Sequence, residues 1–189
     1  MLINNLRYVK ELSDFILDKC DDTEDSKGNF EVITDKSINL ENILIIKVDY
    51  FLQKKIHPNP KAPDCLIIQR CAENEFDIYV VELKDVKRPR KINKKDVREK
   101  FTNCYELFIK KEFKEYFYSD KIKIRNIKLW LVADPHNIRE YPQREHYNKV
   151  TEFDMLLEQV TIKYFNKSIR IKRYHQNPTI KDCSKMRAS

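Results

Sequence analysis

Two apolar segments joined by a short polar segment predict a β-hairpin in the middle of the chain. Residues 63–70 and 76–84 are rich in Ile, Leu, Val and Tyr, whereas residues 71–75 are mainly polar. Ile, Val and Tyr side chains favour extended structure, and a polar turn of this length joins antiparallel strands. We therefore expect two paired strands that fold back on each other about residues 73 and 74.

Helical and extended patterns alternate along the rest of the chain. Apolar residues recur at helical spacing in four segments, at 4–20, 40–55, 94–117 and 152–165. Asn39 and Asn93 precede the second and third of these, and Asn is favoured at helix N-caps. Further strands are expected at 30–35, 127–133 and 168–174, the last of them as an edge strand. This alternation predicts an α/β fold.

The expected hairpin brings polar side chains together at its open end. Folded about its turn, it places Asp64 opposite Glu82 or Leu83. The Cβ atoms of directly opposed residues lie about 4.5–5.5 Å apart, and side chains two positions apart on a strand share one face. Asp64, Glu82 and Lys84 are therefore expected to converge on one point.

Two close carboxylates beside a lysine can hold a divalent cation. Their repulsion is relieved by a raised pKa, a salt bridge or a bound cation, and oxygen ligands suit Mg²⁺. The cation would activate a water and stabilise phosphoryl charge, while Lys84 orients or deprotonates that water and the Leu83 carbonyl adds a ligand. The alternative is a structural salt-bridge cluster, because acid-x-lysine triplets also occur at 85–87 and 112–114.

Pro63-Asp64, followed by Glu82-Leu83-Lys84, resembles the motif of the PD-(D/E)XK nuclease superfamily. The order helix, strand, Pro-Asp strand, Glu-x-Lys strand, long helix, strand extends the resemblance over residues 4–133. It implies a restriction-endonuclease-like core, with a central mixed β-sheet flanked by helices. It also implies that Asp64 and Glu82 bind Mg²⁺, for which Mn²⁺ substitutes, and that Lys84 assists the attacking water.

Many members of this superfamily add further polar residues to the site. An acidic residue can come from the first helix or strand, and the candidates here are Glu11, Glu31 and Asp49. Glu11 is expected on a solvated helix face and Glu31 on an exposed strand position, so the fourth ligand stays open. In the helix after Glu-x-Lys, Asn103 or Lys100 could supply a polar group, although we expect Lys100 to be a solvated lysine.

The net charge of +7 is concentrated in two stretches. Residues 84–100 contain nine Lys or Arg against three Asp or Glu, and residues 167–189 contain seven against one, a local net charge of +6 in each. Such stretches favour a polyanion, although a solvated charged face is the alternative. The residues expected to contact DNA phosphates are Lys87, Arg88, Arg90, Lys91, Lys94 and Lys95.

Composition argues against several other classes of protein. A single glycine, Gly28, is too few for the phosphate-binding loops of P-loop or Rossmann proteins, so no nucleotide cofactor is expected. Five cysteines without a C-x-x-C pair and four scattered histidines predict reduced core thiols and no zinc site. No membrane span or signal pattern is recognisable, which predicts a cytoplasmic protein without membrane contact.

Together these features predict one nuclease domain over residues 1–175 and a basic, flexible tail over 176–189. The expected activity is Mg²⁺-dependent endonucleolytic cleavage of double-stranded DNA by a restriction endonuclease or its cleavage subunit. The size suits the small cleavage subunit of a heterodimeric type IIS restriction enzyme, with sequence recognition by a homodimer or a larger subunit. Alternatives are a repair nuclease, a Holliday-junction resolvase and an inactive nucleic-acid-binding protein on the same fold.

Overall fold

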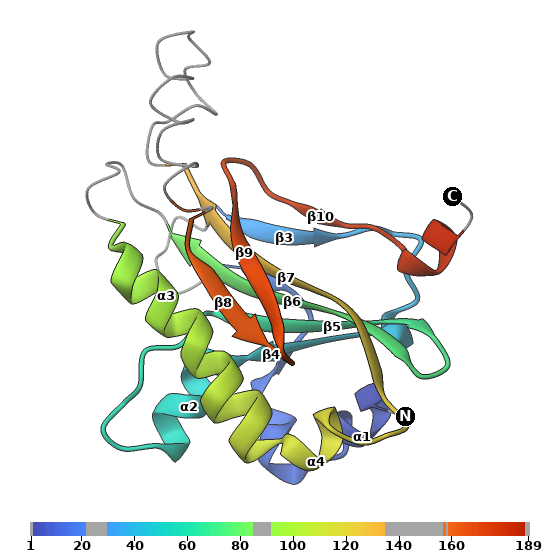
Figure 1. Ribbon diagram of the computed structural model, residues 1–189. Helices are drawn as coiled ribbons and strands as arrows, with labels where there is room; N and C mark the ends of the chain where they lie inside the picture. Colours follow the sequence, from blue (N-terminus) through green and yellow to red (C-terminus); the bar gives the residue numbers. More distant parts are fainter. Residues whose placement is uncertain (1, 22–29, 85–91, 135–156, 158, 188–189) are drawn as a thin grey trace, which may run out of the picture.

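The computed structural model describes residues 2–21, 30–84, 92–134, 157 and 159–187 (Figure 1). A seven-stranded mixed sheet with the order β1-β4-β5-β6-β7-β9-β8 forms its centre. The strands are β1 (Ile16–Leu17), β4 (Ile43–Lys47), β5 (Cys65–Ala72), β6 (Glu75–Lys84), β7 (Lys123–Ala133), β8 (Thr161–Tyr164) and β9 (Lys167–Tyr174). Strands β6, β7 and β9 run parallel to one another, and the other neighbours pair antiparallel. The chain therefore has a mixed α/β fold.

Helices pack on one face of the large sheet and a small sheet packs on the other (Figure 1). The helices are α1 (Leu2–Arg7), η1 (Lys10–Phe15), α2 (Val48–Lys55), α3 (Lys94–Asn103), the π-helix η4 (Cys104–Glu112) and α4 (Lys114–Phe117). The small sheet has the order β10-β3-β2, with β2 (Cys20–Asp21), β3 (Glu31–Thr34) and β10 (Thr179–Ile180). Short 3₁₀ turns, η2 (Leu40–Asn42) and η5 (Cys183–Arg187), complete the elements.

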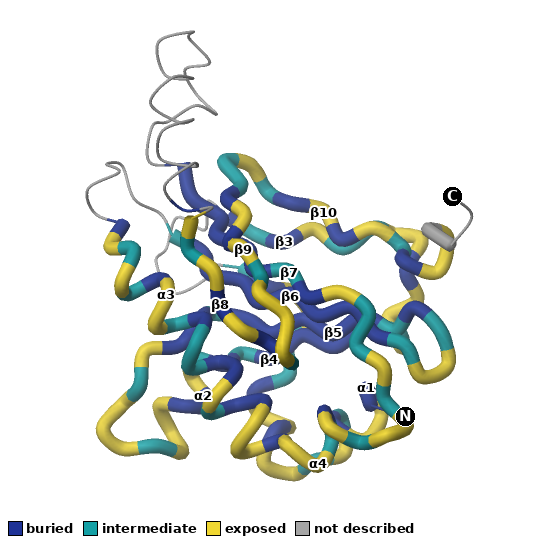
Figure 2. The backbone as a smooth tube through the Cα atoms, in the orientation of Figure 1, coloured by how far each residue is buried: buried dark blue, intermediate teal, exposed yellow. Residues whose placement is uncertain are grey.

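The central strands are buried on both faces, as Figure 2 shows by their dark blue tubes. Along β6, Ile78 and Val80 pack against the helices, whereas Tyr79 and Val81 pack against the small sheet. A strand covered on both sides gains nothing from alternating apolar and polar residues, so its sequence is a continuous apolar run. The expected hairpin is confirmed, because Cys65 pairs with Val81 and the two strands meet at a tight turn.

Other predicted elements are confirmed with adjusted boundaries. The long helix expected over 94–117 forms as α3, η4 and α4 in succession. Asn93 is its N-cap, since its side-chain oxygen accepts a hydrogen bond from the Lys95 N–H over 2.9 Å. The strands expected at 30–35 and 127–133 form as β3 and the longer β7.

The helix predicted over 40–55 is wrong in its first half. Residues 43–47 form β4, and only residues 48–55 are helical, as α2. Ile43, Leu44, Ile45 and Ile46 are all buried, so the segment is apolar on two faces and fits both a strand and a helix. Asn39 does cap a turn, but that turn is η2.

Three further boundaries differ from expectation. The first predicted helix, 4–20, ends as α1 at Arg7 and gives way to η1, β1 and β2. The end of the helix predicted over 152–165 is instead strand β8, while 151–156 lie outside the described residues. The strand predicted at 168–174 forms as β9, but it is not an edge strand because β8 pairs along its outer side.

Two disulfide bonds contradict the expectation of reduced thiols. Cys20 bonds to Cys65 and Cys71 bonds to Cys183, while Cys104 is free and buried. The partners are 45 and 112 residues apart in sequence, so the fold brings them together and no local motif indicates the pairing. Disulfides persist in oxidising surroundings, which points away from the cytoplasmic location predicted above. No helix in the described ranges is long and apolar enough to cross a membrane.

The C-terminal segment predicted as a flexible tail is packed against the body of the protein. Thr179 and Ile180 form β10, which pairs in parallel with β3, and Ile180 is fully buried. The bond between Cys183 and Cys71 then fastens the segment to β5. The tail is polar in composition, but the buried Ile180 and the covalent link at Cys183 fix its position.

We expect reduction of the two disulfides to lower the free energy of unfolding by roughly 2–4 kcal/mol for each cross-link, because each one restricts the unfolded chain. Urea titrations with and without dithiothreitol measure the difference. Alkylation in urea without reductant should modify Cys104 alone. Modification of all five cysteines under those conditions would contradict the pairing.

Candidate active site

Asp64 and Glu82 meet at the open end of the β5–β6 hairpin, on the face of the large sheet that the helices cover. Asp64 immediately precedes β5, and the pairing of Cys65 with Val81 brings it opposite Glu82. The backbone N–H of Leu83 donates a hydrogen bond to Asp64 Oδ2 over 2.6 Å. This bond holds one carboxylate beside the other. By strand alternation Lys84 lies on the same face as Glu82.

Lys100 reaches the same point from α3. Its Nζ donates to Glu82 Oε1 over 2.7 Å, and the two side chains are 23% and 1% exposed. The prediction of a solvated Lys100 is therefore wrong. Asn103, the other candidate on this helix, donates instead to the backbone carbonyl of Lys61 over 2.8 Å.

Asp49 supplies a third carboxylate next to the pair. It lies in the first turn of α2, and the N–H of the preceding Val48 donates to the Asp64 carbonyl oxygen over 3.1 Å. Its negative charge acts on Asp64, Glu82 and Lys100 alike. Of the three acidic candidates, Asp49 is the one that the fold brings to the site, because Glu31 lies in the small sheet on the opposite face and Glu11 lies in η1.

Burial and repulsion raise the pKa of both central carboxyls. Burial raises the pKa of Asp64 well above its ordinary value, and the charges of Glu82 and Asp49 raise it further. For Glu82, burial again raises the pKa and outweighs the opposing charges of Lys100 and Lys84. Burial alone would lower the pKa of Lys100, but the charge and hydrogen bond of Glu82 reverse the effect and raise it.

One oxygen of Glu82 marks where a cation would fit. Its Oε2 is buried and has no hydrogen-bond partner within the described part of the chain. A buried polar atom left unpaired costs about 1–3 kcal/mol, and more when it is charged. The oxygens of Glu82 and Asp64 form a donor set that suits Mg²⁺ or Mn²⁺, so these residues fit a divalent cation.

Two of the six residues that are expected to contact DNA phosphates lie within the described residues. Lys94 and Lys95 open α3, on the same helix as Lys100. Lys87, Arg88, Arg90 and Lys91 lie outside the described residues, as do the loop residues after Asp134.

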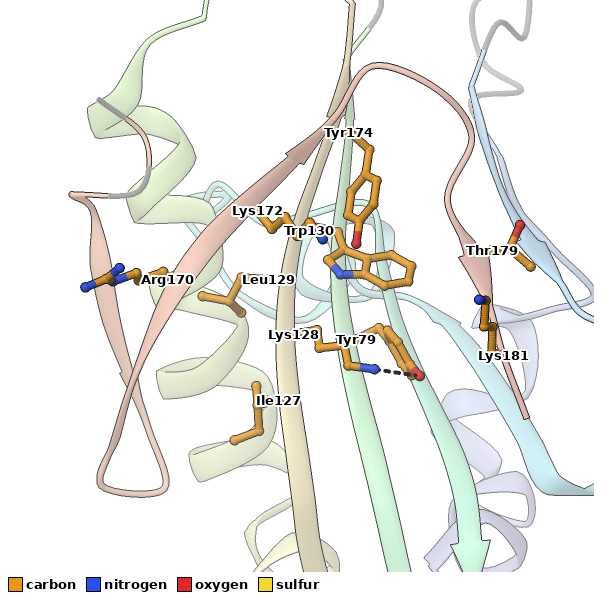
Figure 3. A pocket seen from close by; sticks show the side chains of 10 residues that line it. All are labelled: Tyr79, Ile127, Lys128, Leu129, Trp130, Arg170, Lys172, Tyr174, Thr179 and Lys181. Carbon is orange, nitrogen blue, oxygen red and sulfur yellow. Dashed lines mark hydrogen bonds between the residues drawn. The ribbon is translucent and has the colours of Figure 1, made fainter. Parts of the chain in front are cut away.

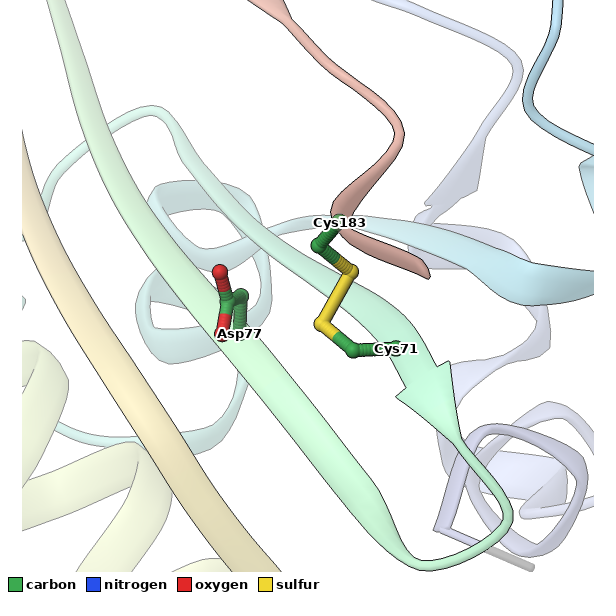
Figure 4. Close-up of side chains that lie close together, drawn as sticks. All are labelled: Cys71, Asp77 and Cys183. Atoms are coloured by element: carbon green, nitrogen blue, oxygen red, sulfur yellow. A yellow bond between two sulfur atoms is a disulfide. The ribbon is translucent and has the colours of Figure 1, made fainter. Parts of the chain in front are cut away.

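Two other groups of side chains lie on the opposite face of the large sheet. One is a pocket lined by aromatic and basic side chains from β6, β7, β9 and the segment around β10 (Figure 3). The other is Cys71, Asp77 and Cys183, whose polar atoms lie within 4.8 Å of one another (Figure 4). The two sulfurs are bonded to each other, so they are not thiolates and this group is no metal site.

No protein-family model, curated protein sequence or solved structure matches this chain.

Lys100 was named from the sequence as a candidate but was assigned to solvent, although the sequence carried a signal for its burial. Val97, Phe101 and Cys104 are buried on one face of the long helix. Lys100 stands three residues after the first of these and four before the last, so helical spacing places it on that same buried face. A lysine at such a position needs an anionic partner, and Glu82 provides it.

Lys100→Met is expected to lower the free energy of unfolding by about 3 kcal/mol at pH 8, because it leaves the buried Glu82 carboxylate uncompensated. The pKa of Glu82 is already raised, so at pH 5 the carboxyl is more readily protonated and the loss should be smaller. Urea denaturation at both pH values tests this. Lys110→Met is the matched control, since Lys110 pairs with Glu106 on the exposed surface and should change stability little.

Asp64→Asn should stabilise the metal-free protein at pH 8, by an amount on the order of 1 kcal/mol. The folded-state pKa of Asp64 is raised, so its ionisation destabilises the fold as the pH rises above the ordinary value of 3.8. The advantage of the variant should therefore shrink as the pH falls toward that value. Thermal unfolding in EDTA across this range provides the measurement, and a destabilised variant at pH 8 would contradict the assigned burial.

Proposed function

We propose that this protein is a divalent-metal-dependent nuclease that hydrolyses phosphodiester bonds in DNA. The observation that carries the proposal is the meeting of Asp64 and Glu82, with Asp49 near enough for its charge to act on both, and a buried Glu82 oxygen that has no hydrogen-bond partner among the described residues. Excess buried carboxylate is unfavourable without a cation, and the motif resembles that of PD-(D/E)XK nucleases.

The strand order supports the same proposal. An antiparallel unit of β4, β5 and β6 is followed by the helix α3 and then by β7, which pairs in parallel with β6. This arrangement resembles a restriction-endonuclease-like core, which we infer for the chain. The acidic residues lie at the end of the sheet where β5 begins and β6 ends.

Each residue of the site has a proposed role. Asp64, Glu82 and the Leu83 carbonyl would hold Mg²⁺ or Mn²⁺, with Asp49 as the additional acid. The bound ion supplies an activated water and neutralises charge on the phosphoryl group. Lys84 would orient that water and, as the neutral amine, take its proton or, as the ammonium, stabilise the developing negative charge, and Lys100 positions Glu82 through their ion pair.

The substrate and partners follow from charge and size. Lys94 and Lys95 begin α3 and would contact DNA phosphates, together with the basic residues of 87–91. We propose double-stranded DNA as the substrate of a restriction endonuclease or its cleavage subunit. A second copy or a larger subunit would supply sequence recognition, and no nucleotide cofactor is required.

One observation favours a second candidate, a nucleic-acid-binding protein without cleavage activity. Lys100 already occupies one oxygen of Glu82, as it would in a structural ion pair. In that case the carboxylates would bind no metal, and DNA binding would be independent of divalent ions.

Cleavage of plasmid DNA in Mg²⁺ or Mn²⁺ tests the first proposal against the second. Asp64→Asn, Glu82→Gln and Lys84→Met should each reduce the rate at least about 100-fold, the scale of a lost acid–base or charge-stabilising group. EDTA should abolish the activity.

Glu112→Gln is the matched control, because Glu112 and Lys114 form the same acid-x-lysine triplet on the exposed helix surface. It should cleave like the wild type. DNA binding without cleavage, with and without metal and in the presence of candidate partner subunits, would favour the second candidate.

A further inference from the structure

A pocket of about 420 Å³ lies on the face of the large sheet opposite the carboxylates. Figure 3 shows it between the strands β7 and β9 on one side and the segment around β10 on the other. Its volume falls in the range of small-molecule sites, about 300–1,000 Å³. The disulfide at Cys183 lies two residues beyond Lys181 and fixes the β10 side of the pocket.

Three aromatic rings form the inner wall of the pocket. The ring centroids of Tyr79 and Trp130 are 4.8 Å apart, and those of Trp130 and Tyr174 are 5.1 Å apart. Tyr79 and Trp130 are buried, while Tyr174 is only partly buried and is therefore the ring open to a ligand. Tyr79 is fixed by the hydrogen bond from its hydroxyl to Gln69 Oε1 over 3.1 Å.

Lysines surround this aromatic wall. Lys128 Nζ lies 4.5 Å from the Tyr79 ring centroid and donates to the Tyr79 hydroxyl over 3.2 Å. Lys172 Nζ lies 5.0 Å from the centroid of Tyr174, and Lys181 lines the pocket from the β10 side (Figure 3). Within the described ranges, no carboxylate pairs with Lys172 or Lys181.

A buried carboxylate, Asp77, lies close to these lysines and interacts with several cationic and hydrogen-bonding side chains. Asp77 lies 3.9 Å from Lys128 and 3.8 Å from Arg125, and it accepts hydrogen bonds from Asn126. Because Arg125 and Lys128 offset this carboxylate, the other two lysines, Lys172 and Lys181, give the described lining of the pocket a net positive charge. An anion is therefore the favoured occupant.

We propose that this pocket binds a nucleotide, with the base stacked on Tyr174 and the phosphate held by Lys172 and Lys181. A planar base suits an aromatic wall, and ammonium groups that have no carboxylate partner among the described residues suit a phosphate. The ligand is either a free nucleotide or one nucleotide of a single strand, since both present the same base and phosphate. The site is separate from Asp64 and Glu82, so it stands whether or not the chain cleaves DNA.

Trp130 is the only tryptophan of the chain and lines the pocket, so its fluorescence reports binding. Titration with deoxyadenosine 5′-monophosphate in EDTA should change the emission saturably. Deoxyadenosine and inorganic phosphate alone should each bind at least about tenfold more weakly, because each lacks half of the contacts. A (dA)₆ oligonucleotide that binds more tightly than the mononucleotide would identify a single strand as the ligand, and the reverse order would identify a free nucleotide.

Variants separate this site from a nonspecific basic surface. Lys172→Gln combined with Lys181→Gln should weaken binding about tenfold or more. Tyr174→Leu should also weaken it, whereas Tyr174→Phe should not. Lys114→Gln, on the exposed surface of the helical side of the sheet, should bind like the wild type. The proposal is overturned if the emission does not change, if inorganic phosphate binds as tightly as the nucleotide, or if the paired lysine variant binds as well as the control.

Discussion

Cys65 pairs with Val81 in the β5–β6 hairpin, and the candidate active site depends on that register. Side chains alternate along a strand, so a shift of one residue would turn Glu82 toward the small sheet and away from Asp64. The hydrogen bond from the Leu83 N–H to the Asp64 carboxylate reinforces the register at the end of the sheet where β5 begins and β6 ends. The same alternation places the aromatic and basic pocket on the opposite face.

The charges around Glu82 explain how the metal-free protein tolerates this arrangement. Lys100 offsets the charge on one oxygen of Glu82, and the raised pKa of Asp64 favours the protonated form of the Asp64 carboxyl. Ammonium and proton together thus offset the buried negative charge. Burying the carboxylates costs stability, which is expected where residues are arranged for binding or catalysis. Metal binding would displace the proton and leave Lys100 as a positioning residue.

Local patterns in the sequence were sufficient to predict the hairpin, the long helix and the meeting of Asp64 with Glu82. These features depend on alternation, helical spacing and a cap at Asn93, all of which act over a few residues. The remaining features depend on contacts between distant segments. The strand at 43–47 is buried on both faces and has no distinctive period, and the disulfide that docks the C-terminal segment joins residues 112 positions apart. The position of Asp49 depends on that strand, so the sequence could name Asp49 as a candidate but could not select it over Glu11 and Glu31.

Calorimetric titration of the metal-free protein with Mn²⁺ at pH 7 tests the central claim, that Asp64 and Glu82 form a cation site. Because the pKa of Asp64 is raised, binding should release protons, which two buffers of different ionisation enthalpy detect. We expect saturable binding with proton release in the wild-type protein, and loss of both in Asp64→Asn. No binding to the wild type, or equal binding by the variant, would contradict it.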